Sequence, residues 1–342
     1  MRFGKLWKRF GTLAVCALGL VLVVVSCKGD DSNVLTVYSG RNQHLVGPLL
    51  EKFAEKNEVK IRVRYASTAG IAATVLEEGG NTPADVVYLQ DAGALGALAQ
   101  EEVLVPLDEE LLQQVDRRFR SPDGLWLGTS GRARTIIYNV DAINPDTDLP
   151  DSILGFTDPE WRGRIGWAPT NGSFQAFVTA LRVQLGESEA RGWLEGILAN
   201  DPVIFPNNLT TVRAAAEGEI EVGFVNHYYL HRFLNEKGED FGARNHYIRG
   251  GDPGGMVNVA GVGIISQSDN KPLAEKFVQF LLTSESQNYF ANETFEFPLV
   301  EGVTTQTGIP PLSTLDPPDI DLGEISDLKG TLALLRDVGV LK

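Results

Sequence analysis

The chain has 342 residues and carries 45 acidic against 30 basic side chains, which gives a formal net charge of −15. A surface this acidic repels phosphate backbones, so the composition argues against a protein that binds nucleic acid. Its two cysteines are Cys16 and Cys27, and Cys16 falls within the N-terminal signal described next. We therefore expect no internal disulfide in the mature chain, whose fold must depend on its hydrophobic core.

The N-terminus has the pattern of an export signal, with basic residues in the first nine positions, an apolar run at 13–25 and then Ser26 and Cys27. This run is shorter than the roughly 18 residues that a transmembrane helix needs. Residues 24–27, Val-Val-Ser-Cys, resemble the bacterial lipoprotein signal. The resemblance implies a signal peptide at 1–26 and a tether at 27–33 that is lipidated on Cys27. It also implies an extracytoplasmic protein anchored to the cell membrane, on the periplasmic face if the host has an outer membrane. An ordinary secreted protein with a chance cysteine is the alternative.

Strands and helices alternate in the first half of the mature chain. We expect strands at 34–39, 59–65 and 84–90, and helices at 44–57 and 92–100. In the first helix Leu45, Leu49 and Phe53 recur at four-residue spacing, whereas 59–65 alternates apolar and polar residues as a half-buried strand does. This β-α-β-α order predicts an α/β fold, with a mixed, mostly parallel sheet flanked by helices and ligands at the carboxyl ends of its strands.

The pattern resumes after Pro150, with strands expected at 164–169, 220–226 and 257–266 and helices at 173–186, 188–200, from 210 and at 230–236. About 310 residues are too many for one ordinary core and suit two domains. We expect two lobes that close on a ligand like a clamshell. Lobe 1 is formed by 34–133 and 258–309, and lobe 2 by 134–257 and 310–342. The expected two-strand hinge lies at 129–138 and 257–266.

Six short motifs are spread over nearly the whole mature chain: TVYSGR at 36–41, PADV at 83–86, SGRAR at 130–134, PTNGSF at 169–174, NHYY at 226–229 and EFPLV at 296–300. Together they resemble motifs of the bacterial ferric iron-binding proteins, which are transferrin-like type II periplasmic binding proteins. The resemblance implies the solute-binding component of an ABC importer, with Fe³⁺ as its cargo and an ABC permease as its partner. It also implies a monomer without enzymatic activity.

Tyr228 and Tyr229 are the candidate iron ligands. Ferric iron is a small, hard cation that prefers anionic oxygen donors such as phenolate. Two neighbouring tyrosines taken alone are more often packing groups. Here, however, they stand between the strand at 220–226 and the helix at 230–236. At such a junction both rings can converge on one ion, which adjacent residues of a regular helix do less easily.

Three departures from the family pattern leave the other iron ligands open. Where one subgroup has a histidine and a carboxylate, this chain has Asn42 and Gln90, with His44 and Asp91 close behind them. His44, Asp91 and Gln90 are therefore candidates. The alternatives are that His44 is a solvated residue of a first helical turn and that Asp91 caps the helix after it. A third phenol of a tyrosine-rich subgroup is replaced here by Phe174, which cannot bind a metal.

The resemblance also implies that a synergistic anion, carbonate or phosphate, completes the coordination of the iron. Arg41 and Arg132 match arginines that hold the anion in carbonate-binding relatives, and the guanidinium fork suits a planar oxyanion. Arg134 shares a strand face with Arg132, so the choice between these two stays open. Pairing of the arginines with surface acids is the alternative. A polar shell matched in relatives comprises Asn171, Gly172, Ser173, Asn208 and Asn226.

Two other classes of function stay in view. A binding protein of the same fold for a phosphonate, a polyamine or thiamine would keep every scaffold motif. A secreted hydrolase finds little support, because the segment around Ser130 lacks the second glycine of a nucleophile elbow and the chain has no His-Glu-x-x-His. His227 and His231 have the spacing of a metal pair on a helix, but we expect them to flank the tyrosines on outward faces.

Overall fold

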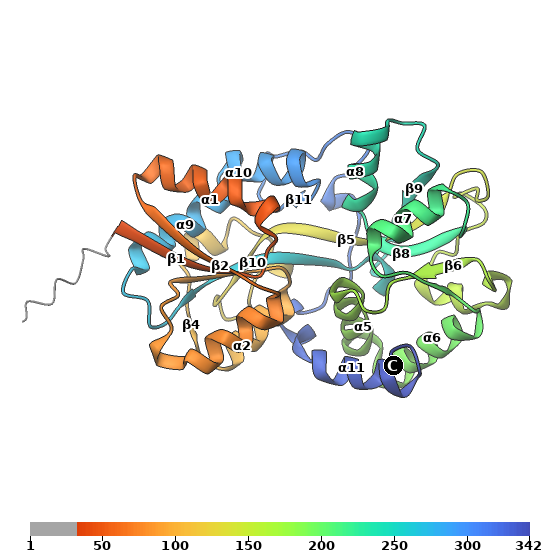
Figure 1. Cartoon of the computed structure of the whole chain (residues 1–342), viewed down its shortest axis with the longest axis horizontal. Helices are drawn as coiled ribbons and strands as arrows, with labels where there is room; N and C mark the ends of the chain where they lie inside the picture. The colour runs from red at the N-terminus through yellow and green to blue at the C-terminus, as the bar shows by residue number, and fades with distance from the viewer. Residues whose placement is uncertain (1–32) are drawn as a thin grey trace, which may run out of the picture. The chain divides into compact units, whose positions relative to one another are not determined.

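The computed structural model of the chain describes residues 33–342, which form strands and helices in alternation (Figure 1). The predicted signal peptide at 1–26, Cys27 and the predicted tether as far as residue 32 lie outside the described residues. From residue 33 onward, no helix has both the length and the apolar character that crossing a membrane requires.

A first sheet, called sheet A, is built mainly from the N-terminal part of the chain. Its strands are β1 Val34–Ser39, β2 Lys60–Tyr65, β3 Val86–Leu89, β4 Leu104–Val105, β10 Val257–Ile265, β11 Phe297–Pro298 and the first part of β5 Leu127–Asn139. β1 pairs in parallel with β2 and β3, whereas β10 runs antiparallel to β3, β4 and β5. Figure 1 shows α1 and α10 on one side of these strands and α2 on the other. The neighbouring helices are α1 Gln43–Asn57, α2 Thr68–Glu78, α3 Ala92–Gln100, α4 Glu109–Leu112, α9 Lys271–Leu282 and α10 Ser284–Tyr289.

A second sheet, sheet B, contains the second part of β5 with β6 Ile165–Trp167, β7 Val203–Ile204, β8 Val222–Asn226 and β9 Ala243–His246. β6 is parallel to β7 and β8, and β5 is antiparallel to β8 and β9. In Figure 1, α7 and α8 lie on one side of these strands and α5 and α6 on the other. The helices here are α5 Gly172–Leu185, α6 Glu187–Ala199, α7 Asn208–Ala216, α8 Tyr228–Lys237 and α11 Leu328–Asp337. Mixed sheets between helices confirm the predicted α/β class. Among the strand pairs of residues 33–342, however, six are antiparallel and four parallel, because β5 and β10 run antiparallel to all their neighbours, so the expectation of a mostly parallel sheet is wrong.

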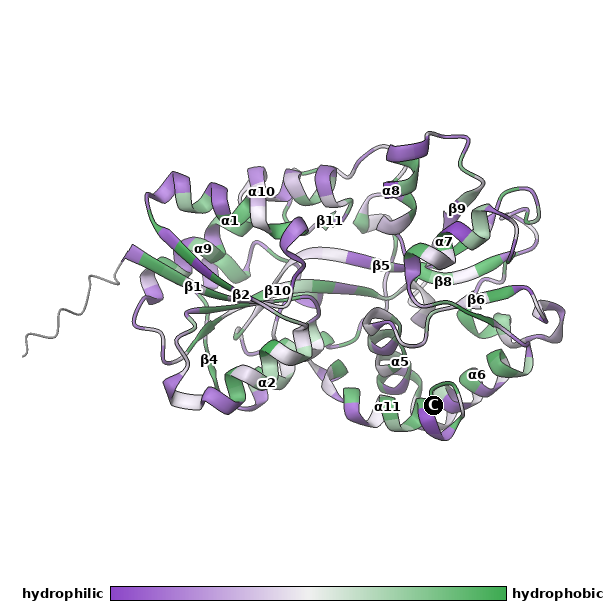
Figure 2. Cartoon of the chain, viewed as in Figure 1, coloured by the Kyte–Doolittle hydropathy of each residue, from purple (hydrophilic) through white to green (hydrophobic). Residues whose placement is uncertain are grey.

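β5 is shared by both sheets, as expected for a strand that crosses between lobes. Its residue Ala133 pairs with Val257 of β10 in sheet A, and the next residue, Arg134, pairs with Asn226 of β8 in sheet B. Figure 2 shows a hydrophilic stretch in the middle of β5, whereas β10 is mainly hydrophobic. The predicted lobe boundaries at 133/134 and 257/258 fall at this point. The division into two closing lobes stays a prediction.

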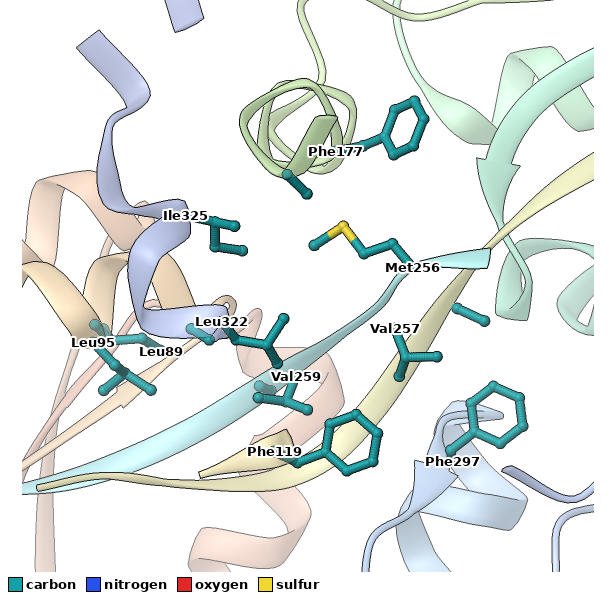
Figure 3. Close-up of a cluster of buried hydrophobic side chains, with 14 of the residues drawn as sticks. Leu89, Leu95, Phe119, Phe177, Met256, Val257, Val259, Phe297, Leu322 and Ile325 are labelled. Atoms are coloured by element: carbon teal, nitrogen blue, oxygen red, sulfur yellow. The ribbon is translucent and has the colours of Figure 1, made fainter. Parts of the chain in front are cut away.

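The C-terminal part of the chain returns to α3, which belongs to the helices around sheet A. A β-carbon at Gly93 or Gly96 of α3 would lie 2.3 Å from the backbone oxygen of Ile325 or Gly323, respectively. Glycine is therefore needed for this close approach. In Figure 3, Leu322 and Ile325 of this segment lie near Leu95 of α3. Phe177 of α5 lies on the other side of Met256. Residues 322–326 thus contact α3, although they fall in the predicted lobe 2.

Most expected elements are present within one or two residues of their predicted ends, and two differences bear on the site. α8 begins at Tyr228 and not at residue 230, because His227 already has helical φ and ψ angles of −55° and −40° directly after β8. The tyrosines therefore lie in the first turn of a helix and not before it. α2, at 68–78, was not predicted, and residues at its start line the cavity described below.

Candidate functional site

A cavity of about 540 Å³ lies where the carboxyl ends of β1 and β3 meet the beginnings of α5 and α8. Its lining includes Gly40 after β1, Gln90 and Asp91 after β3, residues 171–173 at α5, and the tyrosine pair. The strand ends of α/β folds are the expected place for a ligand. A larger hollow, of about 1370 Å³, is lined by residues from 113–120, 282–284 and 298–319 and holds none of the predicted site residues.

Tyr228 and Tyr229 both line the cavity, and their ring centroids are 4.3 Å apart with the planes inclined by 33°. Side chains in a first helical turn have no preceding turn to restrict their rotamers, so two adjacent rings can turn to the same side. Tyr228 is only 4% exposed. Burial, with the neighbouring Tyr229, raises the pKa of Tyr228 above its ordinary value. The phenol is therefore protonated at neutral pH unless a bound cation replaces the proton.

Arg132 and Arg134 are buried side chains that line the same cavity from β5. One Nη of Arg134 donates to Asn226 Oδ1 at 3.0 Å and to Ser173 Oγ at 3.5 Å. Its other Nη is buried and has no partner in the described part of the chain. Burial lowers the pKa of Arg134 to about 10, against the opposing effect of the two tyrosines. Arg132 donates to the carbonyl of Gln90, and its Nε has no partner within residues 33–342. Both guanidinium groups thus retain hydrogen-bonding capacity for an anion.

Arg41 has a different environment from the one expected for an anion-binding residue. It is 1% exposed and forms two hydrogen bonds with the carboxylate of Glu296, at 3.0 and 2.8 Å. Ser130 also donates to that carboxylate at 2.7 Å. Although burial alone would raise the pKa of Glu296, the Arg41 guanidinium holds it below its usual range. Arg41 is not among the cavity-lining residues, so Arg134 is the better-placed partner for Arg132.

The predicted polar shell surrounds Arg134. Ser173 Oγ donates to Asn171 Oδ1 at 2.6 Å and accepts from Asn208 Nδ2 at 3.1 Å. Asn226 accepts the hydrogen bond from Arg134 described above. Residues 171–173, including Gly172, form the N-cap and the first turn of α5. Asn208 is buried and does not line the cavity. These contacts hold Arg134 and the start of α5 together at one end of the cavity.

The other candidate ligands differ in their access to the cavity. Asp91 lines it, and also caps α3 by accepting from the backbone N–H of Ala94 at 3.2 Å. Burial raises the pKa of Asp91, and the nearby Arg132 opposes that shift. Gln90 lines the cavity as well. His44 is exposed in the first turn of α1 and is absent from the lining, which agrees with its interpretation as a solvated residue.

Phe174 is fully buried between aromatic side chains and does not line the cavity. Its ring centroid is 5.4 Å from that of Trp167 in an edge-to-face arrangement and 6.2 Å from that of Phe177. The expectation that His227 and His231 face outward is wrong, because they are 0% and 5% exposed. The His227 ring stacks on Phe297 and the His231 ring on Phe295. Both ring nitrogens of His227 also have hydrogen-bond partners, which offsets the cost of burying that imidazole.

Sequence reasoning missed two residues near the tyrosines. Glu296, the partner of Arg41, was noted only as part of a motif. Arg232 places its guanidinium carbon 5.1 and 5.4 Å from the ring centroids of Tyr228 and Tyr229, respectively. Arg232 follows the tyrosines by three and four residues, and side chains at this spacing share a helix face, so the sequence could have indicated the contact. Among residues 33–342, no group of three or more His, Cys, Asp or Glu side chains could hold a metal ion.

Comparisons with known proteins agree with this geometry. Residues 81–321 match the family model of a bacterial extracellular solute-binding protein. The major ferric iron-binding protein of Neisseria meningitidis is 30% identical over 310 residues, which cover 90% of this chain and 93% of that protein.

Solved structures extend the likeness to the fold. Iron-bound HitA from Pseudomonas aeruginosa is 33% identical, with a TM-score of 0.82 over 90% of this chain and 99% of that chain. A Trichodesmium protein, IdiA or FutA, in complex with iron and citrate is 27% identical, with a TM-score of 0.78 over 90% of this chain and 99% of that one. These matches confirm the predicted periplasmic-binding-protein fold. The chain belongs to the bacterial extracellular solute-binding proteins and, among them, to the ferric iron-binding proteins, which are binding proteins and not enzymes.

Proposed function

We propose that this chain is the extracytoplasmic solute-binding component of an ABC importer and that it binds ferric iron through Tyr228 and Tyr229. The observation that carries the proposal is the placement of two adjacent phenols on one cavity, with their ring centroids 4.3 Å apart. Phenolate oxygens are the anionic donors that a hard trivalent cation prefers. The names of relatives such as the Neisseria ferric iron-binding protein and iron-bound HitA support the choice of metal.

The second half of the site is a small oxyanion, carbonate or phosphate, held between Arg132 and Arg134 at the N-terminus of α5. Unpartnered buried nitrogens on both arginines and the positive end of the helix favour such an anion there. Fe³⁺ with two phenolates keeps one positive charge, and a doubly charged anion between two guanidinium groups adds no net charge. The carboxylate of Asp91 on the same cavity then brings the summed charge of the iron, the phenolates, the anion, Arg132, Arg134 and Asp91 to zero.

The binding protein itself carries out no reaction in this proposal. Iron and anion enter the cavity, the two predicted lobes close, and the loaded protein docks on a membrane permease. Lipidation of Cys27 keeps it at the membrane surface. Recovery of a Cys27→Ser variant in the membrane fraction would contradict the anchor, and recovery in the soluble extracytoplasmic fraction would support it.

Titration of the iron-free protein with ferric nitrilotriacetate in the presence of bicarbonate tests the iron site. A visible phenolate-to-iron charge-transfer band is expected, and it should weaken in Tyr228→Phe and in Tyr229→Phe and disappear in the double variant. Tyr247→Phe is the matched control, because Tyr247 has a buried hydroxyl and is not on the cavity. A colourless wild-type mixture would overturn the proposal.

A further inference from the structure

His227 is a fully buried residue placed directly before the tyrosine pair, and both of its ring nitrogens have partners. Its Nδ1 accepts from the backbone N–H of Ala133 at 3.2 Å, and its Nε2 lies 2.8 Å from the carbonyl oxygen of Phe295. Since Ala133 N–H is a donor and the Phe295 carbonyl is an acceptor, this arrangement requires the neutral tautomer with the proton on Nε2. Burial lowers the pKa of His227 to about 3, in agreement with a neutral ring.

One partner of the His227 imidazole, Ala133, lies at the point where β5 changes sheets. Ala133 is the last β5 residue paired with β10, and Arg134 is the first paired with β8. The backbone N–H of His227 also donates to the Ala133 carbonyl at 3.0 Å. The hydrogen bonds of His227 therefore fix the position of Ala133, which stands between Arg132 and Arg134 in the chain.

The second partner, Phe295, belongs to a segment that is itself fixed to sheet A. Phe295 has a positive φ of 58°, and the next residue, Glu296, binds Arg41 and Ser130. Phe297 then pairs with Gly131 of β5, and its ring stacks on the imidazole with centroids 4.4 Å apart. Through its side chain, His227 thus connects the start of α8 to a rigid part of sheet A.

We propose that His227 is a positioning residue for iron binding, and that it sets the distance between the phenols of α8 and the arginines of β5 through its bonds to Ala133 and Phe295. This inference rests on the proposed function. Tyr228 follows His227 directly, so a change in the imidazole's hydrogen bonds moves the first turn of α8 relative to Arg132 and Arg134. The phenolate-to-iron bonds and the bound anion then no longer fit the same geometry.

Three variants separate the contributions of the imidazole. His227→Asn retains an acceptor near the position of Nδ1, His227→Gln retains a donor near the position of Nε2, and His227→Phe retains only the stacking on Phe297. We expect a shifted charge-transfer band and faster iron release to excess chelator in all three. The acceleration should be about tenfold in the Asn and Gln variants and larger in the Phe variant, as for other residues that orient metal ligands.

His231→Gln is the matched control, because His231 is also a buried histidine of α8 and its ring stacks on Phe295 at 6.1 Å. Its Nε2 has no hydrogen-bond partner among residues 33–342, so His231 provides no comparable connection between α8 and sheet A. This variant should keep the wild-type band and release rate. Folded His227 variants with the wild-type band and release rate would overturn the inference, whereas a wild-type protein without any band would overturn the proposed function instead.

Imidazole ¹⁵N NMR on the wild-type protein provides a test that does not depend on the folding of any variant. The Nε2–H tautomer of His227 is expected both in the metal-free state and in the state loaded with Ga³⁺, a diamagnetic trivalent ion used here in place of paramagnetic Fe³⁺. A proton on Nδ1, or a ring that exchanges between tautomers in the loaded state, would show that the two bonds do not persist and would overturn the inference.

Discussion

Arg41 and Glu296 form a buried ion pair with two hydrogen bonds, although 255 positions separate them in the chain. The side chains are 0% and 1% exposed, and Ser130 of β5 is a third member of the group. The pair joins the loop after β1 to the segment after the helical turns at 284–294. Arg41 therefore has a structural partner of its own and is not among the residues that line the cavity.

Glu296→Gln should destabilise the folded protein by about 3–5 kcal/mol, since it leaves the guanidinium of Arg41 buried without its counter-charge. Urea unfolding of the iron-free protein measures this change. Glu285→Gln is the control, because Glu285 contacts Lys52 and Lys56 at the surface, and it should change the unfolding midpoint little. Equal midpoints for the two variants would contradict the assigned role of Glu296.

The Arg41–Glu296 pair shows what sequence patterns cannot give. Periodicity and caps report on neighbours within a few residues, and they correctly predicted the strand at 34–39 and the helices near 44–57 and 92–100. A buried partner 255 residues away leaves no local pattern. The motif match suggested Arg41 as an anion ligand, and only the tertiary contacts distinguish it from Arg134.

The tyrosine pair was the most accessible part of the site from sequence, because its whole context is local. The strand before it and the helix after it were both predicted, and their junction placed the phenols at a strand end. The predicted start of α8 was two residues too late, because no side-chain cap marks the true start and His227 already has helical backbone angles. The contacts of His227 with Ala133 and Phe295 are long-range and could not be predicted.

Arg134→Gln should weaken the dependence of iron binding on the anion. In wild-type protein, adding bicarbonate should raise the affinity for iron. In the variant this rise in affinity should be smaller by about tenfold to a hundredfold, because the substitution removes a buried donor at the cavity that the anion would use.

Competition against a chelator, with and without bicarbonate, measures the effect of Arg134→Gln. Arg162→Gln is the matched control, because Arg162 forms an exposed ion pair with Asp201. An anion response in Arg134→Gln as large as that of the control would show that Arg134 does not hold the anion.

Asp91→Asn should lower the affinity for iron by about tenfold or more, because it removes a negative charge from the cavity lining. Asparagine is as good an N-cap as aspartate, so α3 keeps its capping bond and the variant isolates the charge. His44→Ala should leave the affinity unchanged, since His44 is exposed and outside the cavity. Chelator competition at neutral pH compares the two, and the opposite order of effects would make His44 the ligand.

Iron affinity should fall as the pH is lowered. Burial raises the pKa of Tyr228 in the free protein, so the free protein holds a proton at neutral pH that the loaded protein has lost. Each proton that iron displaces changes the apparent affinity by about tenfold per pH unit, with weaker binding in acid. Two phenols that both lose a proton give about a hundredfold per unit.

Chelator competition between pH 7 and pH 4, corrected for the titration of the chelator, measures this slope. Tyr228→Phe has one phenol fewer to deprotonate, so its slope should be smaller by about one logarithmic unit per pH unit. Tyr247→Phe should keep the wild-type slope, because Tyr247 is off the cavity. Iron retention that does not change from neutral pH to pH 4 would rule out phenolate ligands, since a proton concentration a thousandfold higher must compete for them.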